Sequence, residues 1–130
     1  MEKMNPEIKA LWIAALKSGD YPKTAGRLAR LDESGSVGYC CLGVLMELGA
    51  KEGVCHGMEI GSPNPYVTTV QPYYPGSNYA EDHWSYQVTM PTREVHKWAN
   101  LDYEAADFLT YLNDSNTTFA PVIEYIDINL

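Results

Sequence analysis

Apolar residues recur at three- and four-residue intervals in five short stretches of the chain, which places them on one face of a helix. The first stretch opens with Asn5 and Pro6, a capping side chain followed by proline at the first helical position. Thr92, Asp102 and Thr118 can cap the last three stretches in the same way. The pattern therefore predicts five helices, over residues 6–18, 40–48, 92–99, 103–112 and 119–127.

The second of these stretches, residues 40–48, is compatible with two structures. Its apolar residues fit one stripe of a helix that Gly49 would end, but a short apolar run also fits a buried strand, and we favour the helix. Residues 20–38 contain Pro22 and several glycines, so we expect a loop there. One short turn or strand is expected within that loop, around residues 27–31.

Residues 53–90 differ in composition from the rest of the chain. They carry five of the ten tyrosines together with several prolines, and residues 66–70 and 84–89 have the composition of strands. We expect an antiparallel hairpin with a long connection, inserted between the helices. The whole chain, residues 1–130, is predicted to be one α+β domain, mainly helical with this small β hairpin or sheet.

The net charge of −8 and the pI near 4.7 disfavour nonspecific binding to nucleic acid or to an anionic membrane. The first residues lack the apolar run of a secretory signal, and the longest apolar-rich stretch, residues 39–48, is about half the length of a membrane span. Three cysteines without zinc-site spacing indicate reduced thiols. We therefore expect a cytoplasmic protein with no metal, no cofactor, no membrane contact and no direct nucleic-acid binding.

The charges are unevenly distributed along the chain. Residues 101–130 contain six carboxylates and neither lysine nor arginine. Three cations lie in the expected loop: Lys23, Arg27 and Arg30. Such side chains bind phosphate or carboxylate, Gly26 lets backbone amides approach an anion, and free amides at the start of the helix over residues 40–48 would add to the site. We predict an anion site there, unless the cations are splayed into water and merely balance the acidic C-terminal third.

The aromatic residues of the insertion have two interpretations. In the first, rings such as Tyr66 and Tyr86 pack the hairpin onto the helices. In the second, other rings project from the insertion, where they stack on a base or anchor a protein interface. The residues predicted to bind a ligand are Lys23, Arg27, Arg30, Tyr39, Tyr73, Tyr74 and Trp84.

Cys40 is the candidate nucleophile, because it lies at an expected helix start, where amides lower a thiol pKa and favour the thiolate. Folding would have to bring it a histidine base, which could be His56, His83 or His96. Cysteine is also a small apolar residue that proteins often bury, and we favour that alternative because no local feature marks a catalytic pair. Cys41, on the apolar stripe, is expected in the core.

Three blocks of the sequence stand out together. They are LWIAALKSGDY at residues 11–21, YCCLGVL at residues 39–45, and LND at residues 112–114 with Phe119 and Tyr125-Ile126. These blocks resemble a family of small proteins encoded by bacteriophages and prophages. The resemblance covers both ends of the chain and leaves residues 51–90 nearly uncovered, and Pro121 stands where an acidic residue is commoner. It implies no catalytic residues, but it implies an infected bacterial host, where small phage proteins disable host factors and nucleotide signals of defence.

Three functions follow as hypotheses. The first is a non-enzymatic phage accessory protein that counters host defence by binding and sequestering an anionic small molecule, such as a signalling nucleotide. The second is an acidic inhibitor whose C-terminal helices dock onto a basic host protein. The third is a cysteine-dependent hydrolase or transferase that uses Cys40. We favour the first hypothesis, and a homo-oligomer is compatible with all three.

Overall fold

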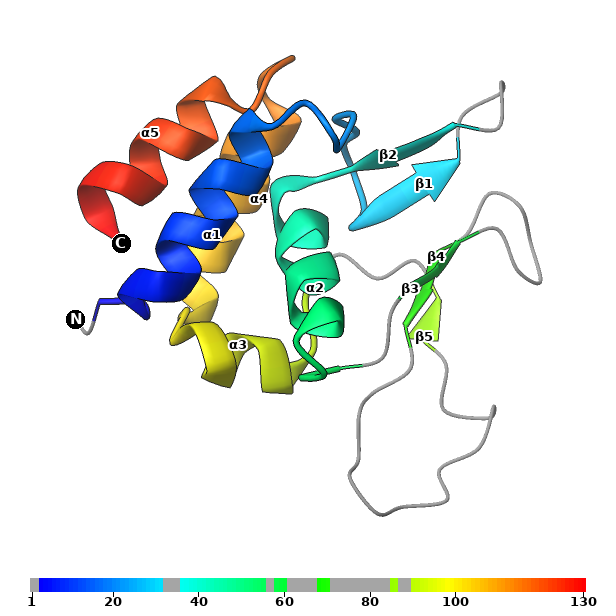
Figure 1. Cartoon of the computed structure of the whole chain (residues 1–130). Coiled ribbons are helices and arrows are strands. Elements are labelled where there is room, and N and C mark those ends of the chain that lie inside the picture. The colour runs from blue at the N-terminus through cyan, green and yellow to red at the C-terminus, as the bar shows by residue number, and fades with distance from the viewer. Residues whose placement is uncertain (1–2, 32–35, 56–57, 61–67, 71–84, 87–89) are drawn as a thin grey trace.

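The computed structural model of the chain, shown in Figure 1, describes residues 3–31, 36–55, 58–60, 68–70, 85–86 and 90–130. These residues form an α+β domain that is mainly helical, as predicted. Its helices are α1 (Pro6–Lys17), α2 (Cys41–Lys51), α3 (Arg93–Ala99), α4 (Tyr103–Asp114) and α5 (Ala120–Asn129). Its strands are β1 (Ala29–Leu31), β2 (Val37–Tyr39), β3 (Met58–Ile60), β4 (Thr68–Val70) and β5 (Ser85–Tyr86).

Helix α2 lies at the centre of the domain, between the other helices and the strands (Figure 1). It contacts α1, α3, α4 and β2. A helix that is enclosed on most sides must be apolar around most of its circumference. The sequence of α2 meets this requirement, because its buried residues run continuously from Cys41 to Met46 and include Gly49. The helix that we favoured over a buried strand is therefore confirmed.

Most of the predicted helix starts are formed as the local sequence indicated. The Asn5 side chain accepts hydrogen bonds from two amides of the first turn of α1, at 2.9 and 3.3 Å. Asp102 accepts from the Ala105 amide in α4, at 2.7 Å. The Thr118 hydroxyl accepts from the Ala120 amide at 3.3 Å, but the N-cap residue of α5 is Phe119 and not Thr118. Thr92 occupies the N-cap of α3 as predicted, but its hydroxyl is buried and makes no hydrogen bond with the described residues.

Three helices, α2, α4 and α5, continue beyond their predicted ends, and in α2 and α4 contacts distant in sequence account for the extension. Gly49 does not end α2, which runs on to Lys51, and its missing side chain lets the helix pack closely against Val95 of α3. The chain turns only at Gly53, which has a φ of +75°. Helix α4 continues past residue 112 through Asn113, whose side chain is fully buried and hydrogen-bonded.

The segment between α1 and α2 contains more structure than the expected loop. The short strand that we expected around residues 27–31 is present as β1, but it pairs antiparallel with a second strand, β2, that we did not expect. Strand β2 is too short to show an alternating pattern and includes Gly38. Its Tyr39 instead exchanges main-chain hydrogen bonds with Pro22 and Thr24, at 2.7 and 2.8 Å. These partners are distant enough in sequence to escape a local pattern.

The insertion contributes a three-stranded sheet in the order β3-β4-β5. The expected hairpin strands are present in part, because β4 and β5 pair antiparallel with Thr69 opposite Tyr86. Strand β3 is a third strand that the sequence did not suggest. The connection between β4 and β5, Tyr66, and the Tyr86 side chain lie outside what the structure describes.

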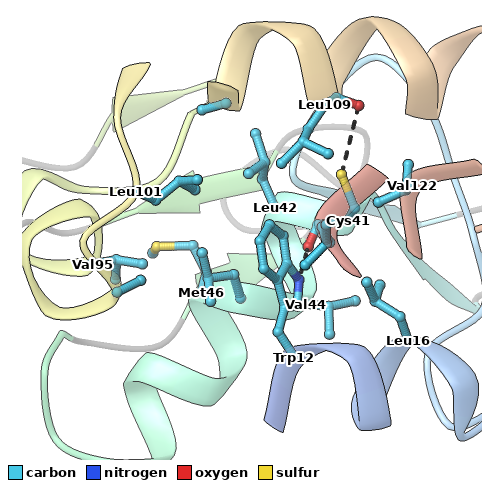
Figure 2. Close-up of a cluster of buried hydrophobic side chains, with 14 of the residues drawn as sticks. Trp12, Leu16, Cys41, Leu42, Val44, Met46, Val95, Leu101, Leu109 and Val122 are labelled. Carbon is cyan, nitrogen blue, oxygen red and sulfur yellow. Dashed lines mark hydrogen bonds between the residues drawn. The ribbon is translucent and has the colours of Figure 1, made fainter. Parts of the chain in front are cut away.

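The core forms where α1, α2, α4 and α5 meet (Figure 2). The fully buried Trp12 of α1 donates a hydrogen bond from its indole Nε1 to the Cys41 carbonyl, at 2.8 Å. The Cys41 thiol in turn donates to the Leu109 carbonyl of α4, at 3.8 Å. Leu42 and Val122 fill the space around this chain of contacts (Figure 2). Cys41 is therefore a core residue, as predicted.

The start of α2 rests directly on the main chain of Leu28. The Cys40 amide donates to the Leu28 carbonyl at 2.9 Å, which brings the first turn of the helix against that peptide. A Cβ atom at Gly43 would overlap the Leu28 carbonyl oxygen and would lie 2.8 Å from the carbonyl carbon. Because backbone atoms cannot move aside as a flexible side chain can, position 43 accepts glycine alone.

The Gly43→Ala substitution is therefore expected to lower the free energy of unfolding by about 3 kcal/mol, because the overlap must separate α2 from Leu28. Gly49→Ala is the matched control in the same helix. Its Cβ would lie 3.1 Å from a Val95 methyl, which can shift, and its gain in helix propensity offsets the contact to within about 1 kcal/mol. Urea unfolding of both variants measures the difference, and equal losses would contradict this account of the Leu28 contact.

Candidate functional site

Of the cations of the predicted anion site, both Lys23 and Arg27 have partners within the protein. The Lys23 ammonium donates to the Asn113 carbonyl at the end of α4, at 2.6 Å. The Gly26 amide donates to the Asp114 carboxylate at 3.1 Å. A cation at a helix C-terminus is stabilised by the helix dipole, so Lys23 caps α4. Arg30 lies on β1 with an exposed side chain, and Arg27 is half-buried.

The amides at the start of α2 are also engaged. The Cys41 amide donates to Asn113 Oδ1 at 3.0 Å, and the Gly43 amide donates to the Cys40 sulfur at 3.4 Å. The Val44 amide donates to the Cys40 carbonyl at 3.1 Å. The predicted site required these amides to be free for a ligand. The Cys41 amide holds α2 against α4, and the Gly43 and Val44 amides bond to Cys40 within the first turn of α2. This arrangement does not support the anion site predicted from the loop that carries Lys23, Arg27 and Arg30 (the basic loop).

Cys40 begins α2 as predicted, but its thiol is not activated. Burial raises its pKa to about 11, although the amides of Leu42 and Gly43 act in the opposite direction. Desolvation penalises the charged thiolate more than the helix amides favour it, so the lowered pKa that the nucleophile hypothesis requires is not found. Cys40 is instead a buried cysteine, the alternative that we favoured. Burial also raises the pKa of Cys41, and it raises that of Cys55 to about 11. All three cysteines are buried and free of disulfides. This environment keeps the thiols protonated near neutral pH.

Of the aromatic residues assigned to the predicted site, only Tyr39 lies among the described residues, and its main chain pairs with that of Lys23. Tyr39 is half-buried and meets the edge of the Tyr21 ring, with centroids 5.2 Å apart. Lys51 donates to the Tyr21 hydroxyl at 3.0 Å and completes this small cluster. The remaining three residues lie outside the described residues: Tyr73, Tyr74 and Trp84.

A pocket of about 440 Å³ opens where α3 meets α4. Helix α3 ends at Asn100, which adopts a left-handed conformation with a φ of 52°, and α4 begins almost at once behind Asp102. This abrupt turn leaves a concave surface between the two helices. The pocket is lined by Arg93, His96, Lys97, Asn100, Leu101, Asp102 and Tyr103.

His96 forms the inner wall of this pocket. It is only 5% exposed, and its Nδ1 lies 2.8 Å from the Leu101 carbonyl, so Nδ1 carries the proton and donates it there. The other ring nitrogen, Nε2, is buried without a hydrogen-bond partner among the described residues. The ring stacks on Tyr103 with centroids 4.0 Å apart and an angle of 22° between the planes. Tyr103 is 56% exposed, so stacking on His96 holds its ring in place at the pocket mouth.

The charges at this pocket differ from those of the basic loop. Arg93 and Lys97 lie one turn apart on the exposed side of α3. Neither cation forms an ion pair or a hydrogen bond with any of the described residues. Asp102 uses its carboxylate to cap α4. Sequence reasoning missed this site because two cations four residues apart on a helix resemble an ordinary solvated face. The signal was their position beside a histidine, at the border of a C-terminal region without cations.

Neither a metal-binding cluster nor a membrane-spanning helix is found among the described residues. No group of three or more His, Cys, Asp or Glu side chains lies close enough together there to hold a metal ion. None of the helices formed by these residues combines the length and the apolar character that crossing a membrane requires. His56 and His83, the other histidines considered as partners for Cys40, lie outside the described residues.

Comparison with known proteins gives one match. The model of a family described as a domain of unknown function, DUF8296, matches residues 4–130. The chain belongs to the DUF8296 family. No curated protein and no solved structure matches it. Because the match covers all five helices of the described residues, both the basic loop and the α3–α4 pocket lie inside the DUF8296 domain.

The three sequence blocks noted above meet at the main chain of one residue of the DUF8296 domain, Cys41. Trp12, from the first block, donates to the Cys41 carbonyl, and Asn113, from the third, accepts from the Cys41 amide. Asn113 is fully buried, and its Nδ2 also donates to the Thr24 carbonyl at 2.9 Å. Each polar group of the Asn113 side chain therefore has a partner. The three blocks thus form a buried hydrogen-bond network that holds α1, α2 and α4 together (the Asn113 network). None of the side chains in this network is positioned as a reacting group.

Replacing the buried Asn113 tests how much this hydrogen-bond network contributes to stability. Asn113→Ala is expected to lower the free energy of unfolding by about 3 kcal/mol, because it leaves the Cys41 amide and the Thr24 carbonyl buried without partners. Asn116→Ala is a matched control, since this half-buried asparagine makes one hydrogen bond, to the Leu112 carbonyl, and should cost less than about 1 kcal/mol. Thermal or urea unfolding measures the two losses in the free energy of unfolding. Similar losses for Asn113→Ala and Asn116→Ala would show that the Asn113 network contributes little to stability.

The burial of the thiols makes a separate prediction about reactivity. With a pKa of about 11, Cys40 is a thiolate in roughly one molecule in a thousand at pH 8, so iodoacetamide should modify the folded protein very slowly. The same reagent in urea should modify all three cysteines quickly. A raised pKa also means that the thiol favours the folded state below pH 9.0, and that this contribution is lost as the pH rises towards 11. Rapid, selective labelling of Cys40 at neutral pH, measured by mass spectrometry, would restore it as a nucleophile.

Proposed function

We propose that this DUF8296 protein is a non-enzymatic binding protein that holds an anionic small molecule with a planar ring in the α3–α4 pocket. One observation carries the proposal. Two cations that no described residue engages, Arg93 and Lys97, line a pocket of about 440 Å³ beside the exposed Tyr103 ring. The proposed ligand is thus still an anion, as predicted from the sequence, but we propose that it binds at the junction of α3 and α4 and not at the basic loop.

The two parts of the pocket suit the two parts of such a ligand. Arginine binds phosphate or carboxylate through a planar fork of donors, and lysine adds a point charge that can approach the same anion. The Tyr103 ring, held from behind by His96, offers its other face for stacking on a base. The volume falls within the ordinary range of small-molecule sites, from about 300 to about 1,000 Å³. Together these properties favour a nucleotide over a simple inorganic anion.

Binding is favoured over catalysis by the condition of the reactive side chains. Cys40 is buried, and its raised pKa keeps it protonated. His96 uses Nδ1 for the Leu101 carbonyl, and its Nε2 is buried. A general base must reach the proton that it removes, and neither group is presented to the pocket in a way that allows this. The exposed residues of the pocket are Arg93, Lys97, Asn100, Asp102 and Tyr103, and among them the two cations and the Tyr103 ring are the groups suited to binding an anion with a planar ring.

The biological setting extends the proposal. The resemblance to phage and prophage proteins supports a role in the cytoplasm of an infected bacterial host, where the protein sequesters a signalling nucleotide and so counters host defence. A net charge of −8 repels long polyanions such as nucleic acids. A small anion, in contrast, responds mainly to the nearby cations of α3, because salt screens charges beyond about 10 Å. Such a protein selects a single nucleotide or dinucleotide over nucleic acid.

Calorimetric titration tests this function directly. The native protein is titrated with a panel of mononucleotides, linear dinucleotides and cyclic dinucleotides. For a ligand that binds, the double variant Arg93→Ala/Lys97→Ala should lower the affinity at least about tenfold, because it removes two charge-assisted contacts. The double variant Lys17→Ala/Arg30→Ala is the matched control, since it removes the same charge from exposed positions elsewhere and should leave the affinity nearly unchanged.

A second comparison separates stacking from charge. Tyr103→Ala should weaken nucleotide binding about tenfold, while inorganic phosphate, which has no ring, should bind both proteins equally. Absence of heat with every nucleotide would remove the proposal. Affinity that depends on Arg27 and Arg30, and not on Arg93 and Lys97, would return the site to the basic loop.

A further inference from the structure

A cluster of exposed aromatic rings lies on α4 and α5, outside the pocket. The Phe108 ring stacks on Tyr111 of the same helix with centroids 6.1 Å apart, and it meets Tyr125 of α5 at 4.7 Å. Phe108 is 42% exposed and Tyr111 is 64% exposed. The rings therefore form one continuous aromatic surface on neighbouring helices. Figure 1 shows that α5 lies on the side of the helical body away from the strands.

Carboxylates surround this aromatic cluster. Glu104, Asp107 and Asp114 lie three or four positions from Phe108 or Tyr111 along α4, so they share its exposed face. The chain supplies no neutralising cation of its own from residues 101–130. Lysines from elsewhere bond to main-chain carbonyls near the C-terminal ends of the two helices: Lys3 to Asn129 and Lys9 to Asp127 on α5, and Lys23 to Asn113 on α4. At that end of α4 the Asp114 carboxylate also accepts from the Gly26 amide, so Glu104 and Asp107 are the carboxylates beside the rings that face solvent. The rings thus lie within a negative local field.

We propose that this aromatic and acidic face is a docking surface for an arginine-containing, basic segment of another protein. An arginine guanidinium can lie flat on an exposed ring and, at the same time, direct its fork of donors to a neighbouring carboxylate. Phe108 and Tyr111 supply the rings, and the flanking acidic side chains of α4 supply the carboxylates. Aromatic residues gathered on a surface rather than in a core mark such interaction sites.

Charge selects this occupant over the alternatives. A second copy of the chain, also with a net charge of −8, would bring the same carboxylates face to face. Nucleic acid would be repelled for the same reason. The surface is also separate from the ligand pocket, since Tyr111 lies eight residues beyond Tyr103, or roughly 12 Å along the helix axis. This inference therefore does not rest on the proposed function.

The test uses a short fluorescent peptide of alternating arginine and serine, with the full-length protein and fluorescence anisotropy. Tyr111→Ala should weaken binding about threefold to fivefold through loss of ring stacking, with little effect on folding because the side chain is 64% exposed. Leu11→Ala is the matched control, because Leu11 is also exposed, at 47%, but lies on α1. The paired variant Glu104→Gln/Asp107→Asn should weaken binding by a similar factor, whereas Glu52→Gln on the C-cap of α2 should not.

The ring contribution distinguishes specific docking from simple charge attraction. The corresponding lysine and serine peptide should bind native protein more weakly than the arginine peptide and should respond little to Tyr111→Ala. The proposal is overturned if the arginine peptide fails to bind or if Tyr111→Ala and Leu11→Ala have equal effects. It is also overturned if sedimentation shows native self-association that Tyr111→Ala abolishes, because a second copy would then occupy the face. Nucleotide binding should be unchanged by Tyr111→Ala, which separates this test from that of the pocket.

Discussion

The main-chain amide and carbonyl of Cys41 are both hydrogen-bonded to side chains of other helices, and the arrangement of the helices depends on these two bonds. The Cys41 carbonyl accepts from the Trp12 indole on α1, and its amide donates to the Asn113 side chain on α4. A buried polar group is costly unless it is paired, so these two bonds allow only one relative placement of the three helices. Gly43 adds a steric condition, because the close contact with Leu28 fixes how far α2 can approach the loop below it. The short motif around the two cysteines thus specifies packing.

Local signals predicted the elements well and their limits less well. The start of α1 was predictable because Asn5 acts on amides two and three residues away. The true end of α2 was not, because Gly49 is retained in the helix by its packing against Val95, a residue distant in sequence. Strand β2 depends on main-chain bonds to Pro22 and Thr24, which a three-residue pattern cannot reveal. The end of α2 and the existence of β2 could therefore not be predicted, because both depend on contacts between residues distant in sequence.

The same limit applies to the candidate site. Lys23 appeared available for an anion, but its ammonium bonds to a carbonyl 90 residues further along the chain. Cys40 occupies the helix start that was predicted, yet burial outweighs the helix amides, and the balance of these opposing effects on its pKa depends on the surrounding core. Arg93 and Lys97, in contrast, lie on a short helix with nothing distinctive in sequence, and they gain importance because the chain turns at Asn100 and places Tyr103 beside them.

Helix α4 connects the two surfaces that we assign to binding, and their charges are opposite. Its first residue, Tyr103, faces cations of α3, whereas its middle and end carry rings among carboxylates. A strongly acidic chain can present a cationic pocket only where cations are close together and acidic side chains are engaged, and the Asp102 cap meets that condition at the pocket edge. Beyond it the exposed face of α4 carries Glu104 and Asp107 beside the rings, and this contrast supports our two proposals, a small anion at the start of the helix and a basic segment further along it. Because the two proposed sites lie at different positions along one helix, occupation of one would leave the other accessible, which a single site of mixed charge would not allow.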